Sequence, residues 1–76
     1  MKDLIEFMAR SIVEEPDVVE VSEEPGEDGR VIIRLHVAED DKGKIIGRQG
    51  RVAEAMRTLL RVAAIKGGTR ASLEIP

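Results

Sequence analysis

An unbroken alternation of apolar and polar residues from position 30 to 37 constrains the fold more than any other feature of this chain. One face carries Val31, Ile33, Leu35 and Val37, and the other carries Arg30, Ile32, Arg34 and His36. This period of two is typical of a β-strand with one face in the core and the other mostly in water. The rest of the chain must therefore supply an apolar layer for one side of a sheet.

Two longer segments have the helical spacing of apolar residues that such a layer needs. Residues 3–15 predict a first helix, which Pro16 ends because proline cannot continue the hydrogen-bond ladder. Residues 51–66 predict a long helix that ends at the Gly67–Gly68 pair. The expected buried stripe of this helix consists of Val52, Ala55, Met56, Leu59, Leu60 and Ala63. Truncation of Leu59 should then remove part of the core.

The remaining segments complete the order α-β-β-α-α-β. Residues 18–23 and 71–75 predict two further strands, and the turn-forming residues 24–29 predict a hairpin loop. A short helical turn docked by Ile45 and Ile46 fits residues 42–50. The crossover that follows the hairpin should set the second and third strands parallel. We expect an α+β fold, with a three-stranded mixed sheet covered on one face by three helices.

Length and composition exclude several classes of protein. A chain of 76 residues and 8.4 kDa has room for one core, so residues 1–76 are expected to form a single domain. Without cysteine and with one histidine, it has no disulfide framework and no plausible zinc site, and we expect no cofactor. No apolar run approaches the ~18 residues of a spanning helix, and the N-terminus lacks a secretory pattern, which makes the cytoplasm the default location.

The formal net charge of −3 hides an uneven distribution. Residues 1–38 hold ten acids and four Lys/Arg, giving −6, whereas residues 39–76 hold five acids and eight Lys/Arg, giving +3. Between Lys42 and Arg70 the only acid is Glu54. Because a polyanion senses the local potential over about 8 Å at physiological salt, a basic face on an acidic protein can still bind phosphates.

The segment Gly47-Arg48-Gln49-Gly50 joins the short helical turn to the start of the long helix. The first backbone N–H groups of a helix have no intrahelical partner and lie at the positive end of the helix dipole, so this end attracts anions. Glycines allow a phosphate backbone to approach closely, and Lys44, Arg48 and Arg51 add positive charge. A Gly-x-x-Gly turn alone also fits a plain helix–helix connection.

The context of this turn is more specific than the turn itself. The run Gly-Lys-Ile-Ile-Gly-Arg-Gln-Gly-Arg-Val-Ala follows an alternating strand inside an α-β-β-α-α-β chain. It resembles a KH domain of the type II arrangement, whose Gly-x-x-Gly loop grips about four nucleotides of single-stranded RNA. The resemblance spans nearly the whole chain, and is strongest to the small bacterial single-KH proteins of the KhpA type.

The resemblance implies roles for particular residues and partners. It makes Gly47, Arg48, Gln49 and Gly50 the backbone clamp, flanked by Lys44 and Arg51, with Ile46 lining the groove. It further implies a non-catalytic RNA chaperone or regulator. Such proteins pair as homodimers and with a larger RNA-binding protein of the KhpB (Jag) type.

The sequence evidence for a nucleotide-binding, metal or catalytic site is weaker. The spacings of a nucleotide-hydrolase phosphate loop and of a dinucleotide-binding fingerprint do not occur. Asp40 and Asp41 are adjacent acids, but the sequence places no third metal ligand beside them. His36 lies on the wet face of its strand with no nucleophile motif nearby. We therefore expect no enzymatic activity.

The main alternative is a protein-interaction module that uses this fold for dimerisation or partner docking and binds little RNA. Two basic residues of the long helix, Arg57 and Arg61, fit either an RNA track or a subunit interface. The sequence decides neither between RNA binding and protein docking nor between the two roles of these arginines.

Overall fold

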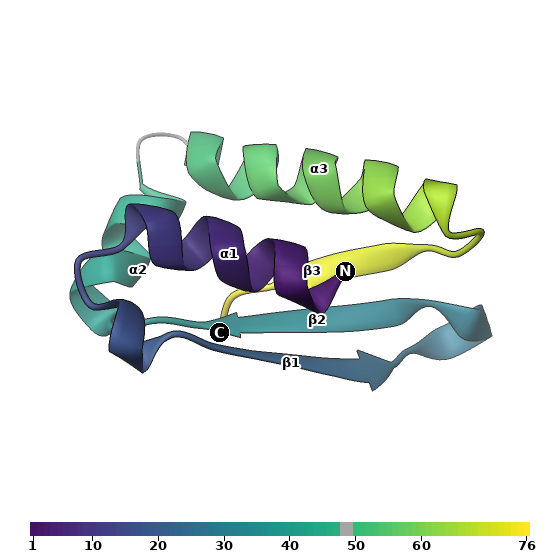
Figure 1. Ribbon diagram of the computed structural model, residues 1–76, viewed down its shortest axis with the longest axis horizontal. Helices are drawn as coiled ribbons and strands as arrows, with labels where there is room; N and C mark the ends of the chain where they lie inside the picture. The colour runs from purple at the N-terminus through teal and green to yellow at the C-terminus, as the bar shows by residue number, and fades with distance from the viewer. Residues whose placement is uncertain (48–49) are drawn as a thin grey trace.

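The computed structural model describes residues 1–47 and 50–76 (Figure 1). Its elements are α1 (Lys2–Ile12), the 3-10 turn η1 (Pro16–Val18), β1 (Glu20–Pro25), the 3-10 turn η2 (Glu27–Gly29), β2 (Val31–His36), α2 (Glu39–Ile46), α3 (Arg51–Lys66) and β3 (Ala71–Glu74). The order of helices and strands is the predicted α-β-β-α-α-β. The long helix has the predicted bounds, because the two glycines at its C-terminus interrupt a continuous helical pattern.

The three strands form one mixed sheet in the order β1-β2-β3. β1 is antiparallel to β2, with Val21 opposite Leu35, and β3 is parallel to β2, with Leu73 beside Ile33. These four residues lie on the same side of the sheet, because side chains alternate along each strand. The predicted hairpin and parallel crossover are both confirmed.

The helices lie on one side of this sheet. Figure 1 shows α1 and α3 above it, with α2 at the end where the chain leaves β2. The buried core between the layers consists of Ile5, Ala9, Val19, Ile33, Leu35, Val37, Ile45, Ala53, Met56, Leu60 and Leu73. The predicted two-layer α+β architecture is therefore confirmed.

Several element boundaries differ from the prediction. The first helix ends at Ile12, and η1 takes the place of the expected start of β1, since the N–H groups of Val18 and Val19 donate to the carbonyls of Glu15 and Pro16 at 3.1 Å. The short helix is longer than expected and begins at Glu39. Three consecutive acids in its first turn interact favourably with the helix dipole, which explains the earlier start.

Asp41 links this short helix to the end of α1. The side chain is only 1% exposed, and its two carboxylate oxygens accept hydrogen bonds from the backbone N–H groups of Glu14 and Glu15 at 3.0 and 3.1 Å. Those N–H groups belong to the connection between α1 and η1, which has no helix partner for them. Asp41 therefore acts as a structural brace, and its oxygens are engaged within the fold.

The buried face of α3 is rotated from the predicted stripe. Ala53, Met56, Leu60 and Ala64 are buried, whereas Leu59 is 49% exposed. The expectation that Leu59 belongs to the core is wrong. The apolar residues of α3 extend over more than half of its circumference, and the sequence pattern alone does not say which part of that arc the sheet covers.

Candidate nucleic-acid interface

The candidate interface is built around the junction between α2 and α3. Gly47 caps the C-terminus of α2, and its N–H donates to the carbonyl of Gly43 at 2.8 Å. On the other side of the junction, the N–H of Gly50 donates to the carbonyl of Gly47 at 3.0 Å. The two predicted clamp residues Arg48 and Gln49 lie outside the described residues. The hydrogen bond between Gly50 and Gly47 holds the start of α3 close to the end of α2.

Gly47 and Gly50 are each required at their position for a different physical reason. A Cβ atom at Gly47 would clash with the backbone carbonyl oxygen of Gly43, so no other residue fits without moving the end of α2. Gly50 has φ +69°, a left-handed conformation that side chains rarely adopt, and a Cβ there would meet nothing within 4 Å. The turn thus needs glycine at both positions, and the backbone at Gly50 borders open space.

The N-terminus of α3 begins at this open position. Gly50 is its N-cap, and within the described part of the chain no side chain hydrogen-bonds to this end. The first N–H groups of a 16-residue helix are thus left to solvent or to a ligand. Together with the positive end of the helix dipole, they favour an anion such as a phosphate.

Lysine and arginine side chains surround this end. Arg51 is exposed on the first turn of α3. Lys44, in the last turn of α2, forms an ion pair with Glu14 at 2.5 Å, and this hydrogen bond raises the pKa of the Lys44 ammonium. Both side chains are more than half exposed, so solvent screens the pair and an incoming phosphate can compete with Glu14 for the lysine.

Two neighbouring isoleucines at the end of α2 have opposite roles. Ile45 is 2% exposed and anchors α2 in the core, whereas Ile46 is 44% exposed beside the glycine turn. The expectation that both dock the helix is wrong, because one helical step turns the second side chain outward. The exposed Ile46 offers an apolar contact next to the charged turn.

Arg57 and Arg61 lie on the side of α3 that faces the edge strand β3. A hollow of about 150 Å³ between the two elements is lined by Arg57, Leu60, Arg61, Ala71, Ser72 and Leu73. An adjoining hollow of about 700 Å³ is lined by Arg34, Arg57, Leu73, Glu74, Ile75 and Pro76. The basic residues of α3 therefore border a groove along β3. Sequence reasoning did not find the β3 side of this groove, because nothing in residues 71–75 distinguishes an edge strand from a central one.

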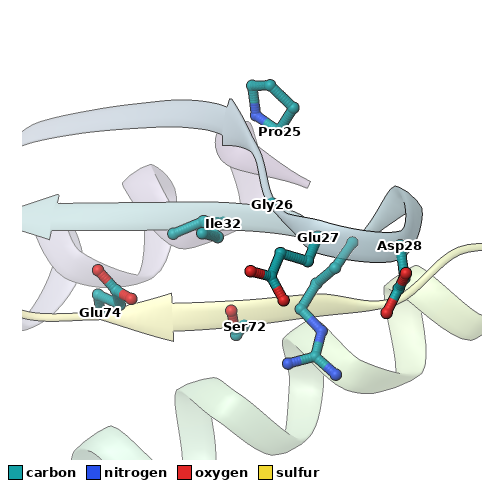
Figure 2. A pocket seen from close by; sticks show the side chains of 8 residues that line it. Pro25, Gly26, Glu27, Asp28, Ile32, Ser72 and Glu74 are labelled. Atoms are coloured by element: carbon teal, nitrogen blue, oxygen red, sulfur yellow. The ribbon is translucent and has the colours of Figure 1, made fainter.

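A separate hollow of about 480 Å³ lies on the outer face of the sheet, at the hairpin end (Figure 2). Carboxylates of Glu27, Asp28 and Glu74 surround it, with Arg30 as the one basic residue of its lining. Negative charge would repel a phosphate backbone there. The outer sheet face is therefore a poor site for a polyanion, in contrast to the α2–α3 junction.

Comparison with known proteins places this chain in a family. A family model described as "KhpA/KhpB, KH domain" matches residues 2–75. The chain is 49% identical to "RNA-binding protein KhpA" of Clostridium acetobutylicum, with 99% of each chain covered. It is 47% identical to the protein of that name in Caldanaerobacter subterraneus subsp. tengcongensis, again over 99% of each, and 44% identical to that of Aquifex aeolicus, over 99% of this chain and 94% of the relative. No solved structure was found to match. Among the described residues, no helix is long and apolar enough to cross a membrane.

Proposed function

The chain belongs to the KhpA/KhpB family of KH domains, and from this membership we propose that it is a non-catalytic protein that binds single-stranded RNA. Relatives that are 44–49% identical over nearly the whole chain carry the name RNA-binding protein. Residues 1–76 would then work as one KH domain. The single observation that carries the proposal is the N-terminus of α3, which glycine precedes, to which no described side chain hydrogen-bonds and around which basic residues cluster.

The proposed clamp holds the RNA backbone at the α2–α3 junction. Its residues are Lys44, Ile46, Gly47, Arg48, Gln49, Gly50 and Arg51. Phosphates approach the open backbone at Gly50, while lysine and arginine side chains neutralise their charge. The exposed Ile46 contacts a base or sugar by its apolar surface. Stacking on Phe, Tyr or Trp has no part in this site, because the only such residue in the sequence is Phe7 on α1.

From the clamp, the RNA continues along the groove between α3 and β3. Arg57 and Arg61 border that groove, and the half-buried Ile75 adds apolar surface at its edge. This placement favours the RNA track over a subunit interface for the two arginines. A footprint of about four nucleotides per KH domain implies weak binding by one copy.

The biological role that fits this site is that of an RNA chaperone or regulator acting in the bacterial cytoplasm. Weak contact with a few nucleotides becomes useful when several domains act together. We therefore propose that the protein works as a dimer, and with a larger RNA-binding protein of the KhpB (Jag) type. The family model, which covers both KhpA and KhpB, supports that pairing.

The proposal is tested by the salt dependence of RNA binding. If the wild-type protein holds three or four phosphates, log affinity for a short labelled oligouridine should fall with log salt at a slope of about −2 to −3, at roughly 0.7 per phosphate. Fluorescence anisotropy at about 50 to 300 mM salt measures this slope. Absence of binding at the lowest salt would instead favour the second candidate function, a protein-docking module, for which the exposed apolar residues of α1 and α3 provide the surface.

Replacement of Glu14 by glutamine should strengthen RNA binding. The carboxylate of Glu14 forms an ion pair with the ammonium group of Lys44. Glu14→Gln removes the negative charge that competes with a phosphate for this ammonium group. Since the pair is exposed and screened, the expected gain is about twofold to threefold at low salt, with no change in thermal stability. Anisotropy titrations of the two proteins side by side measure the difference.

Glu6→Gln is the matched control for this prediction. Glu6 pairs with Arg10 at 3.7 Å on α1, and the substitution makes the same change of net charge away from the clamp and from the groove along β3. RNA affinity should stay at the wild-type value. An equal gain in both variants would mean that the protein's net charge, rather than release of Lys44, sets the affinity.

A further inference from the structure

Glu14 is held at two points by one face of α2. Its backbone N–H donates to a carboxylate oxygen of Asp41 at 3.0 Å, and its own carboxylate accepts from the ammonium group of Lys44 at 2.5 Å. Asp41 and Lys44 are three residues apart on α2, so their side chains lie on the same face of the helix. The connection between α1 and η1 is therefore fastened to α2 through both the backbone and the side chain of Glu14.

The two contacts differ in burial. Asp41 is 1% exposed and also accepts from the N–H of Glu15 at 3.1 Å, so both of its carboxylate oxygens are used. The side chains of Glu14 and Lys44, by contrast, are 76% and 53% exposed. An exposed ion pair is weak partly because two long side chains must be ordered to form it. The buried contact fixes the backbone of Glu14 and so lowers the entropic cost of the exposed contact.

The ion pair affects the proposed clamp, because Lys44 is one of the clamp residues. Lys44 lies in the last turn of α2, three residues before Gly47. The hydrogen bond to Glu14 raises the pKa of the Lys44 ammonium, and the charges of Asp41 and Asp40 add to this effect. A phosphate that binds Lys44 must therefore replace a carboxylate that is already bound there.

We propose that Asp41 is a positioning residue for the RNA clamp, which holds the carboxylate of Glu14 at Lys44 and thereby sets how readily a phosphate displaces it. This inference rests on the function proposed for the α2–α3 junction. Asp41 is too buried to contact RNA, and it acts through Glu14. It stabilises the connection between α1 and α2, and at the same time it lowers the affinity of the clamp.

The neighbouring residue Asp40 provides the matched comparison. Asp40 also lies in the first turn of α2, but its side chain is exposed. Within the described parts of the chain, the backbone N–H groups of Glu14 and Glu15 donate to Asp41 and not to Asp40. Both acids raise the pKa of Lys44 through their charge. Neutralising either one makes the same change of charge near the clamp, but only Asp41 holds Glu14 in place.

Asp41→Asn should therefore bind RNA more tightly than Asp40→Asn. Asparagine offers one acceptor oxygen and turns an NH₂ group toward the second backbone N–H, which releases the connection from α2. The expected difference in affinity for a short labelled oligouridine at low salt is about twofold, since the ion pair that is lost is exposed. A brace with a structural role alone would give the opposite sign, because a loosened α2 would weaken the clamp.

The same two substitutions are then compared in a chain that carries Glu14→Gln. With no carboxylate left to position, Asp41→Asn and Asp40→Asn should bind RNA equally. Circular dichroism at low temperature establishes which variants are folded. The proposal would be overturned by a folded Asp41→Asn that binds no more tightly than Asp40→Asn, or by a difference that persists in the Glu14→Gln chain.

Two measurements without RNA separate the positioning role from the clamp. In an NMR titration, the pKa of Lys44 should fall further in Asp41→Asn than in Asp40→Asn, because only the first variant loses the hydrogen bond to Glu14. In Lys44→Met, a change at an exposed residue that leaves Asp41 intact, the amide protons of Glu14 and Glu15 should exchange with solvent about two to three times faster than in the wild type, because coupling between two contacts is reciprocal. Unchanged amide exchange in Lys44→Met would overturn the positioning role even if Asp41→Asn does not fold. Absence of RNA binding by the wild type would refute the clamp, and these two measurements would still decide whether Asp41 positions Glu14.

Discussion

A chain that carries Arg48→Asp and Gln49→Asp should lose at least a hundredfold in affinity for short single-stranded RNA. The two substitutions change the charge of the turn from +1 to −2 at the N-terminus of α3, where the phosphates are expected to bind. A charged hydrogen bond is worth about 1.5 to 3 kcal/mol, and reversing the charge adds repulsion to that loss. Fluorescence anisotropy at low salt measures the affinity.

The double variant should remain folded. Ile45, Ala53 and Met56, which hold α2 and α3 in the core, all lie outside the turn. The midpoint of thermal unfolding, followed by circular dichroism, is therefore expected to change by no more than a few degrees, the equivalent of about 0.5 kcal/mol in a domain of this size. A variant that is folded but does not bind RNA would show that RNA affinity depends on the residues of the turn.

Arg30→Asp with Ser22→Asp provides the matched control. The pair makes the same change of three charge units on exposed residues outside the α2–α3 junction: Ser22 lies in β1 opposite Arg34, and Arg30 directly precedes β2. It should retain most of the RNA affinity, since only long-range electrostatics change. If the control lost as much affinity as the turn variant, the protein would bind RNA through its overall charge, and the assignment of the clamp would fail.

The order of elements could be predicted because local signals in this chain agree with its fold. Alternation at residues 30–37, the proline at 16 and the glycine pair at 67–68 each act over a few residues. The parallel pairing of β2 and β3 followed from the two helices between them. These features depend on chain connectivity and on backbone sterics, both of which the sequence displays directly.

The parts that could not be predicted depend on contacts between distant residues. The brace from Asp41 to Glu14 and Glu15 joins positions 26 and 27 residues apart, and no local pattern distinguishes Asp41 from the neighbouring Asp40. The ion pair of Lys44 with Glu14 is of the same kind. Both contacts depend on the position of α2 against the end of α1, which no local sequence pattern shows.

The sequence predicts one reason for the two glycines of the turn, the close approach of a phosphate backbone, and that role stays a prediction. The structure shows two further reasons: steric conflict with the end of α2 at Gly47, and a left-handed backbone at Gly50. The placement of Arg57 and Arg61 was left open because it requires the position of β3 relative to α3. A helical pattern gives the angle between two side chains around the axis, but not the neighbour that each one faces.

The sharpest test of how α3 is oriented compares two adjacent leucines. Leu60 is 1% exposed and Leu59 is 49% exposed, although both lie in the predicted apolar stripe. Leu60→Ala should lower the free energy of unfolding by about 2 to 5 kcal/mol, because it removes buried methyl groups and leaves a cavity. A 76-residue domain has a total stability of roughly 4 to 11 kcal/mol, so this variant should lose at least 10 °C in its melting temperature.

Leu59→Ala should lower the free energy of unfolding by less than about 1 kcal/mol when urea unfolding is measured in the same way, because this side chain is 49% exposed. Equal costs for the two leucines would mean that α3 is rotated about its axis relative to the structure. The same rotation would move Arg57 and Arg61 relative to β3 and so remove the basis for the proposed RNA groove. This pair of variants therefore tests the fold and the placement of the groove together.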